Sequence, residues 1–236
     1  MSPLTGLMVL LYEYNEQRIA VLMNSEGNAD VLNRVPKSAP KVVRFVAHEL
    51  TNRDLVEGLR RGDVGVAAAF YDRFAVKINR LVWRLLGADT EHDDVVNQVF
   101  VNILSSIKKL RHPEAFDDWI CGIAVNTVRK EIRSRKYRRI LVSVPEYQER
   151  KAEEGETEKQ VLVRRVFKVL NTMKTEDRIA FILRYVEGNT LGEVAVSGGY
   201  SLATAKRRIA RAKREFLKRV RKDTALASFI EEIKDV

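Results

Sequence analysis

The chain has 236 residues, and its 42 Lys and Arg residues against 32 Asp and Glu residues give a net charge of +10. That balance points to a polyanionic partner, either a nucleic acid or an anionic membrane surface. The single cysteine, Cys121, excludes an internal disulfide framework and a cysteine-based zinc finger, and only three histidines argue against a multi-histidine metal site. We therefore expect no metal and no cofactor.

The sequence gives no sign of a membrane-spanning segment, because no run approaches about 18 apolar residues. The N-terminus has a short apolar patch, Leu7 to Leu11, but lacks the basic region and the small-residue cleavage site of a signal peptide. We therefore expect a cytoplasmic protein. Its 45% of hydrophobic residues are sufficient for a packed core.

Residues 1–46 form an N-terminal extension of unknown role, in which Leu7–Tyr12 and Arg18–Met23 are candidates for two short strands. Apolar residues at helical spacing then predict four helices, which contain Leu55 to Leu59, Val66 to Leu86, Val95 to Leu104 and Phe116 to Ala124. Thr51 or Asn52 is expected to cap the first, Asp89 or Thr90 the third, and Pro113 to start the fourth.

Residues 141–160 contain Pro145, Gly155 and many glutamates, which is typical of a linker. Beyond it, periodicity and caps predict helices at Val161–Leu170, at Thr175–Gly188, at Leu191–Val196 and in a long final segment that Ser201 caps. Residues 223–236 form a short tail. We therefore predict an all-α fold with two small helical domains, 47–140 and 161–222, joined by a flexible linker.

The positive charge is concentrated in two segments. Arg129 to Arg139 contain seven basic residues and one acid, and Lys206 to Lys222 contain ten basic residues and one acid. Together the two segments carry +15, so the rest of the chain has a net charge of −5. Two such dense segments are less easily explained as ordinary solvated helix faces than one would be.

The final helix separates charge from apolar residues. At about 100° per residue, the residues within about 60° of Arg211 are polar or cationic: Thr204, Arg207, Arg208, Arg214 and Lys218. The opposite side carries the predicted core residues, Leu202, Ala205, Ile209, Ala212, Phe216 and Val220. A short helix, a glycine turn and a cationic second helix are typical of the helix-turn-helix, whose second helix enters the DNA major groove.

The fourth helix has a second cationic face, on which Arg129, Lys130 and Arg133 lie near Asn126. Trp119 borders that face, and basic residues beside an aromatic ring and an amide suit splayed single-stranded bases. Core packing remains the alternative role for Trp119, and a solvent-facing amide for Asn126. In the third helix, Asp93 and Asp94 suit the helix dipole, and they are also candidates for contacts with a basic protein partner.

Two stretches of the chain resemble bacterial RNA polymerase sigma factors. Asp93-Asp94-Val95-Val96-Asn97-Gln98-Val99-Phe100, followed by Phe116-x-x-Trp119-x-x-x-Ile123-Ala124-x-Asn126, resembles region 2 of that family. Leu183 to Ala195, followed by Ser201 to Ala212, resembles region 4. With only these two regions and a short linker, the chain is similar to the extracytoplasmic-function class.

The resemblance implies a partner or a role for each surface. Core RNA polymerase would be contacted through its largest-subunit clamp and its flap, and the clamp contact would use Asp93, Asp94, Asn97 and Phe100. The −10 element, melted to a single strand, would be bound by Trp119, Asn126, Arg129, Lys130 and Arg133. The −35 duplex would be read by Lys206, Arg207 and Arg211, with Ser201, Thr204, Arg208 and Arg214 at phosphates. Anti-sigma antagonists are common in the family, but no residue here identifies one.

Three positions depart from the family's usual pattern. Asn97-Gln98 replaces the common Gln-Glu/Asp pair, so one acid of the polymerase interface is absent. Gly198 stands where Leu is usual, which predicts a looser turn, and Arg207 stands where Ser is common, which predicts a different −35 preference.

Two other classes of function remain alternatives. A free-standing helix-turn-helix regulator would explain residues 161–222, but it would leave the fourth helix and the acidic third helix without a role. A nucleic-acid-processing enzyme would need a carboxylate cluster or a metal near the basic faces, for which Asp93, Asp94, Asp117 and Asp118 are the candidates. We expect a factor that carries out no covalent chemistry.

Overall fold

A computed structural model describes residues 50–87, 92–142 and 157–228, except for the side chains of 139–142. The described residues form helices and turns without a strand, in agreement with the all-α prediction. The predicted strands Leu7–Tyr12 and Arg18–Met23 and the predicted caps Asp89 and Thr90 lie outside these residues. No helix in the described ranges has the length and apolar character needed to cross a membrane.

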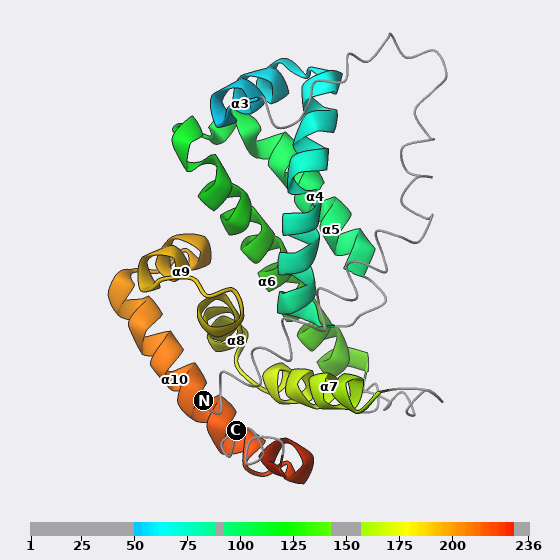
Figure 1. The fold of residues 1–236 in the computed structure, drawn as a ribbon, viewed down its shortest axis with the longest axis vertical. Coiled ribbons are helices and arrows are strands. Elements are labelled where there is room, and N and C mark those ends of the chain that lie inside the picture. The colour runs from blue at the N-terminus through cyan, green and yellow to red at the C-terminus, as the bar shows by residue number, and fades with distance from the viewer. Residues whose placement is uncertain (1–49, 88–91, 143–156, 229–236) are drawn as a thin grey trace.

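The N-terminal half contains four α-helices. They are α3 (Asn52–Arg61), α4 (Val64–Leu86), α5 (His92–Ser106) and α6 (Phe116–Val142), with 3-10 turns at Ile107–Lys109 and Pro113–Ala115 between α5 and α6. Thr51 caps α3 as predicted, in a capping box with Asp54. Helix α6 continues without a break from the core into the first basic segment (Figure 1).

The C-terminal half consists of short helices followed by one long helix. They are α7 (Glu158–Asn171), α8 (Thr175–Phe181), a π-helical turn η4 (Ile182–Val186), α9 (Leu191–Gly198) and α10 (Leu202–Val220). Helix α7 begins three residues before the predicted Val161, because Thr157 and Gln160 form a capping box there. Ser201 accepts a hydrogen bond from the Thr204 backbone N–H and caps α10 as predicted.

Aromatic side chains anchor the core of each half. In the N-terminal half, the rings of Phe70, Phe74 and Phe116 are buried, with centroids 5.3–5.9 Å apart. In the C-terminal half, Phe181 and Phe216 are fully buried with centroids 4.4 Å apart. Burying one phenylalanine contributes about 1.5–3 kcal/mol, so these contacts fix α4 against α6 and α8 against α10.

One residue that the periodicity placed in the core is exposed. Leu202 is 58% exposed because it is the first residue of α10, ahead of the turns that pack against α8. The prediction for Leu202 was therefore wrong. In α5, Leu104 is 45% exposed, whereas the neighbouring Ile103 is fully buried.

The two halves pack against each other, with α8 and α9 lying along one side of α6 (Figure 1). The end of α4 also meets α7, where Gly87 lies against the ring of Phe167. Gly87 has φ +81° and ψ −171°, a conformation that is essentially restricted to glycine.

We expect Gly87→Ala to destabilise the fold by about 2 kcal/mol more than Gly62→Ala. An alanine Cβ at 87 would lie 2.8 Å from the Phe167 ring, whereas at Gly62, which also has positive φ, it would meet nothing within 4 Å. Urea unfolding followed by circular dichroism measures the difference. Equal losses in the two variants would mean that α7 does not pack against the end of α4.

Candidate nucleic-acid interface

Helix α10 presents a cationic surface because its other side is fixed in the core. Ala205, Ala212 and Phe216 are fully buried, and their spacing keeps one face of the helix turned inward. The exposed face carries three of the predicted DNA contacts, Lys206, Arg207 and Arg214, and Ser201 is exposed at the N-terminal cap. Thr204 lies half-buried beside that cap, with its hydroxyl 3.0 Å from that of Ser201.

Arg211, the third predicted base reader, is committed to a different contact. Its Nε and Nη2 donate to the two carboxylate oxygens of Asp177 at 2.7 and 2.6 Å, in a bidentate pair. Asp177 is fully buried, whereas the Arg211 side chain is 43% exposed. The hydrogen bonds to Asp177 raise the pKa of the Arg211 guanidinium. Arg211 therefore joins α10 to α8, which limits its reach toward a base.

The predicted single-strand face of α6 is exposed in part. Asn126 and Lys130 are exposed, and the Arg133 side chain is 61% exposed. Arg129 donates to the side-chain oxygen of Asn126, but only 13% of the Arg129 side chain is exposed. Trp119 is half-buried and stacks on Phe116, with the two ring centroids 6.2 Å apart. Core packing therefore accounts for much of the Trp119 surface.

The predicted residues of the two DNA faces converge on one carboxylate, Glu176 in the first turn of α8. Its Oε1 lies 3.0 Å from Arg129 Nε and accepts from Arg133 Nη2 at 2.6 Å, and its Oε2 lies 3.4 Å from Arg208 Nη1. Sequence analysis alone assigned no site role to Glu176, because an acid in the first turn of a helix is sufficiently explained by the helix dipole.

Tyr200 completes this cluster and was also missed. Its hydroxyl donates to Glu176 Oε2 at 2.5 Å and accepts from Arg129 at 3.2 Å, while its ring lies 4.5 Å from the Arg208 guanidinium. Burial, and then the hydrogen bond to Glu176, raise the pKa of Tyr200 to about 12, so the hydroxyl keeps its proton. Gly198 gives the ring its space, since a Cβ there would lie 2.3 Å from the ring.

The outer face of α5 is both acidic and apolar. Asp93, Asp94 and Asn97 are exposed, as the prediction of a partner-binding face requires. The neighbouring Val101 is 57% exposed, and together with Leu104 it forms an apolar patch that the sequence did not reveal. Phe100 is only 8% exposed and packs against Phe70 and Tyr71, so it supports α5 from inside. The burial of Phe100 does not fit the predicted direct contact of this residue with polymerase.

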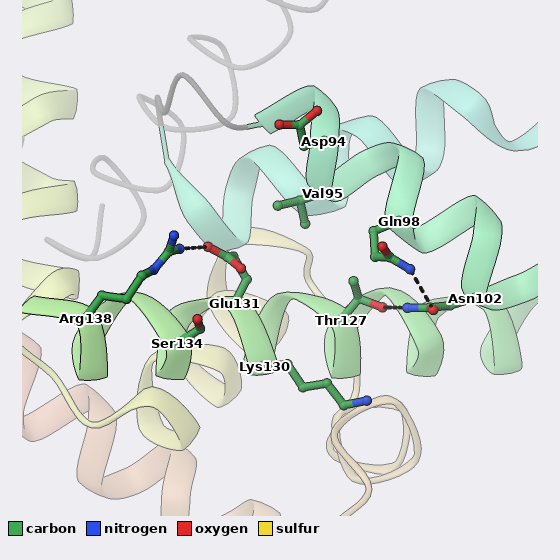
Figure 2. Close-up of a pocket in the computed structure, with 9 residues that line it drawn as sticks. All are labelled: Asp94, Val95, Gln98, Asn102, Thr127, Lys130, Glu131, Ser134 and Arg138. Atoms are coloured by element: carbon green, nitrogen blue, oxygen red, sulfur yellow. Dashed lines mark hydrogen bonds and ion pairs between the residues drawn. The ribbon is translucent and has the colours of Figure 1, made fainter.

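A groove of about 530 Å³ lies between α5 and α6 (Figure 2). Its lining includes Asp94 and Gln98 from the predicted polymerase face and Lys130 from the predicted single-strand face. Figure 2 shows that Asn102 links the two helices, accepting from Gln98 at 3.0 Å and donating to Thr127 at 2.9 Å. The two predicted surfaces are therefore neighbours across one groove.

The carboxylates that an enzyme would need do not gather into one site. Asp117 accepts hydrogen bonds from Lys77 at 2.7 Å and from Asn52 at 3.1 Å. Burial acts to raise the pKa of Asp117, but the hydrogen bond and the charge of Lys77 outweigh it and lower that pKa. Within the described ranges, no three His, Cys, Asp or Glu side chains are placed to hold a metal ion.

Each half of the chain matches a known protein family. Residues 70–138 match the family described as Sigma-70 region 2, and residues 164–216 match the family described as Sigma-70, region 4. The ECF RNA polymerase sigma-E factor of Escherichia coli is 25% identical over 179 residues, which cover 71% of this chain and 93% of that protein. The sigma-E factor of Haemophilus influenzae is 27% identical, with coverage of 71% and 94%.

A solved structure of CnrH in complex with the cytosolic domain of CnrY has a similar fold. The TM-score is 0.53 at 21% sequence identity, and the alignment covers 73% of this chain and 99% of that chain.

Proposed function

Since this chain belongs to the extracytoplasmic-function class of RNA polymerase sigma factors, we propose that its exposed surfaces divide the steps of transcription initiation among them. The chain binds core RNA polymerase and promoter DNA and directs initiation. Residues 47–140 act as region 2 and residues 161–222 as region 4, with 141–160 as the linker and 223–236 as a tail. Residues 1–46 have no assigned role.

Region 4 reads the −35 duplex with α10. Lys206 and Arg207 project from the first half of the exposed face, which a helix-turn-helix lays in the major groove. There an arginine pairs with a guanine edge, while Ser201, Thr204 and Arg214 hold phosphates. Arg211 positions α10 through Asp177, and this pair supports the reading helix from behind.

Region 2 binds the −10 element as a single strand along α6. Asn126, Lys130 and Arg133 offer an amide and two cations to bases and phosphates, and the exposed part of Trp119 lies beside them. The factor performs no covalent chemistry. Capture of unstacked bases by this face offsets the loss of stacking, which amounts to a few kcal/mol per flipped base.

The face of α5 binds the polymerase clamp. Its exposed acids Asp93 and Asp94 lie in the first turn of the helix, and its exposed apolar residues Val101 and Leu104 lie further along it; acids beside an apolar patch are typical of a protein interface. Acting with polymerase places the chain in the cytoplasm. Because anti-sigma antagonists are common in the family, we also propose an anti-sigma protein as a partner of this chain.

The observation that carries this proposal is that the chain presents two exposed cationic helix faces, on α6 and α10, together with an acidic and apolar face on α5. Selection of promoter DNA from a random pool tests it. Chain plus core polymerase is expected to enrich sequences with two separated elements, and core polymerase alone to enrich none. The chain without polymerase would enrich a duplex site equally well if it were a free-standing helix-turn-helix regulator, and that result would contradict the proposal.

The same selection examines the unusual Arg207. With Arg207→Ala, we expect the preference at one position of the −35 element to relax by about 1–3 kcal/mol, because one bidentate contact is lost. With Arg214→Ala, the matched phosphate-contact control, binding should weaken evenly across sequences. If Arg207→Ala leaves the selected sequence unchanged, Arg207 does not read a base.

A further inference from the structure

Tyr137, near the C-terminal end of α6, presents an aromatic ring that belongs to neither core. The residue is 64% exposed, whereas every other aromatic residue in the described ranges is buried or half-buried. A single exposed ring carries little weight by itself, because folded proteins leave many apolar atoms in water. The position of this ring on α6 is more informative, because it lies in line with the proposed single-strand face.

The ring continues the row of side chains proposed to bind the −10 strand, which begins at Asn126. At about 100° per residue, Lys130, Arg133 and Tyr137 all project within about 40° of the direction of Asn126. All four residues are exposed. Helix α6 is uninterrupted over Phe116–Val142 and rises about 1.5 Å per residue, so Tyr137 lies about 16 Å beyond Asn126 on the same face.

The neighbouring ion pairs leave this ring uncovered. Glu131 accepts hydrogen bonds from Arg135 Nε at 2.6 Å and from Arg138 Nη2 at 2.9 Å. These three residues lie about 120–180° around the helix from Asn126, and Figure 2 shows Arg138 turned toward Glu131. The two arginines are therefore held on the other side of α6. The side of Tyr137 keeps the two cations of the row, and a ring among cations is typical of sites that bind single strands.

The place of Tyr137 along the promoter follows from the order of the chain. Under the proposed function, on which this inference rests, region 4 binds the −35 element, upstream of the −10 element. The linker to region 4 follows α6, so the C-terminal end of α6 is the upstream end of the single-strand face. At about 3.4 Å per base pair, a span of about 16 Å corresponds to about five positions upstream of the base at Asn126. As the last member of the row, Tyr137 lies where the melted strand rejoins the duplex.

We propose that Tyr137 sets the upstream edge of the melted DNA by stacking on the base at the junction of single strand and duplex. The last base pair of a duplex has one face without a stacking neighbour, and an aromatic ring can cover that face. Because every base has such a face, the contact fixes where melting ends and carries little sequence preference. Stacking of one base on an aromatic side chain changes affinity about tenfold or more.

The variants Tyr137→Ala and Tyr137→Phe test this contact, because only the second keeps a ring. Val64→Ala is the matched control, since Val64 at the start of α4 is 66% exposed and lies outside the row. The probe is a junction DNA, which is duplex upstream and continues as one strand through the selected −10 element, with 2-aminopurine at one position at a time. Each variant is measured as the full chain with core polymerase.

We expect the original chain to quench 2-aminopurine at one position near the junction. Tyr137→Ala should lose this quenching and bind the junction DNA about tenfold more weakly, whereas Tyr137→Phe and Val64→Ala should stay within about twofold of the original affinity. The salt dependence separates stacking from charge. The slope of log affinity against log salt should be unchanged in Tyr137→Ala, but about 0.7 less steep in Lys130→Ala, which removes a phosphate contact.

Equal affinity of Tyr137→Ala and Val64→Ala for the junction DNA would overturn the inference, as would quenching that persists in Tyr137→Ala. An equal loss in Tyr137→Phe and Tyr137→Ala would also overturn it, because the contact would then belong to the hydroxyl. If the original chain does not improve the binding of junction DNA by core polymerase, the proposed function fails. If it does and the variants all bind alike, only the role of Tyr137 fails.

Discussion

Replacing Arg211 by alanine is expected to lower the free energy of unfolding by about 3 kcal/mol, the largest loss we anticipate from one surface arginine. The reason is that Asp177, its bidentate partner, is fully buried. Removing one member of a buried pair leaves the other charge without compensation, at a cost of about 3–5 kcal/mol. We take the lower end because the Arg211 side chain is 43% exposed, so water can approach from that side.

Urea unfolding followed by circular dichroism measures this loss, and Arg207→Ala is the control. Arg207 is exposed one turn away on the same helix, so its replacement should change stability by less than about 0.5 kcal/mol. In a double-mutant cycle, Asp177→Ala combined with Arg211→Ala should cost clearly less than the sum of the two single changes. If the Arg211→Ala variant has the same free energy of unfolding as the original chain but selects different promoter sequences, Arg211 contacts a base.

Reversing one charge on α5, by Asp94→Arg, is expected to weaken the binding of core RNA polymerase about 30-fold or more. Asp94 is exposed at the start of the helix and lies beside the groove shared with α6. Like charges brought together in an interface cost several kcal/mol, whereas 30-fold corresponds to about 2 kcal/mol. Val101→Glu, which places a charge in the apolar patch, should weaken binding to a similar extent.

The control for this prediction is Glu57→Arg, which makes the same charge change on the exposed face of α3. Its affinity for core polymerase should stay within about threefold of the original, since rim and remote charges have small effects. Affinity is measured by fluorescence anisotropy of the labelled chain titrated with core enzyme. Equal binding by Asp94→Arg and the original chain would remove α5 from the polymerase interface.

Local signals predicted most of the fold. Capping residues such as Thr51 and Ser201 marked helix starts correctly, because a cap depends only on residues within one turn. The charge separation on α10 was also predictable, since the period of a helix places Ala205, Ala212 and Phe216 on one side. The prediction that Leu202 lies in the core was wrong, because helical periodicity does not show which turns of a helix pack against the rest of the protein.

The contacts between the halves could not be predicted, because they join residues distant in sequence. Arg129 and Glu176 are far apart along the chain. Arg129 was explained by its place on the basic face of its helix, and Glu176 by the favourable effect of an acid in the first turn of a helix. Asp177 had the same local explanation, which hid its pair with Arg211. Gly198, which stands where the family usually has Leu, was the sequence signal for this contact between the halves. Its role could be understood only once the position of the Tyr200 ring was known.

Transcription in a reconstituted system tests the central claim most directly. Core RNA polymerase, the full chain and a template carrying the selected promoter should give a transcript of defined length, and the core enzyme without the chain should give none. Asp94→Arg should reduce that transcript sharply, because the chain would no longer join the polymerase. If the chain binds the promoter but core enzyme makes no specific transcript with it, the assignment of this chain as a sigma factor is contradicted.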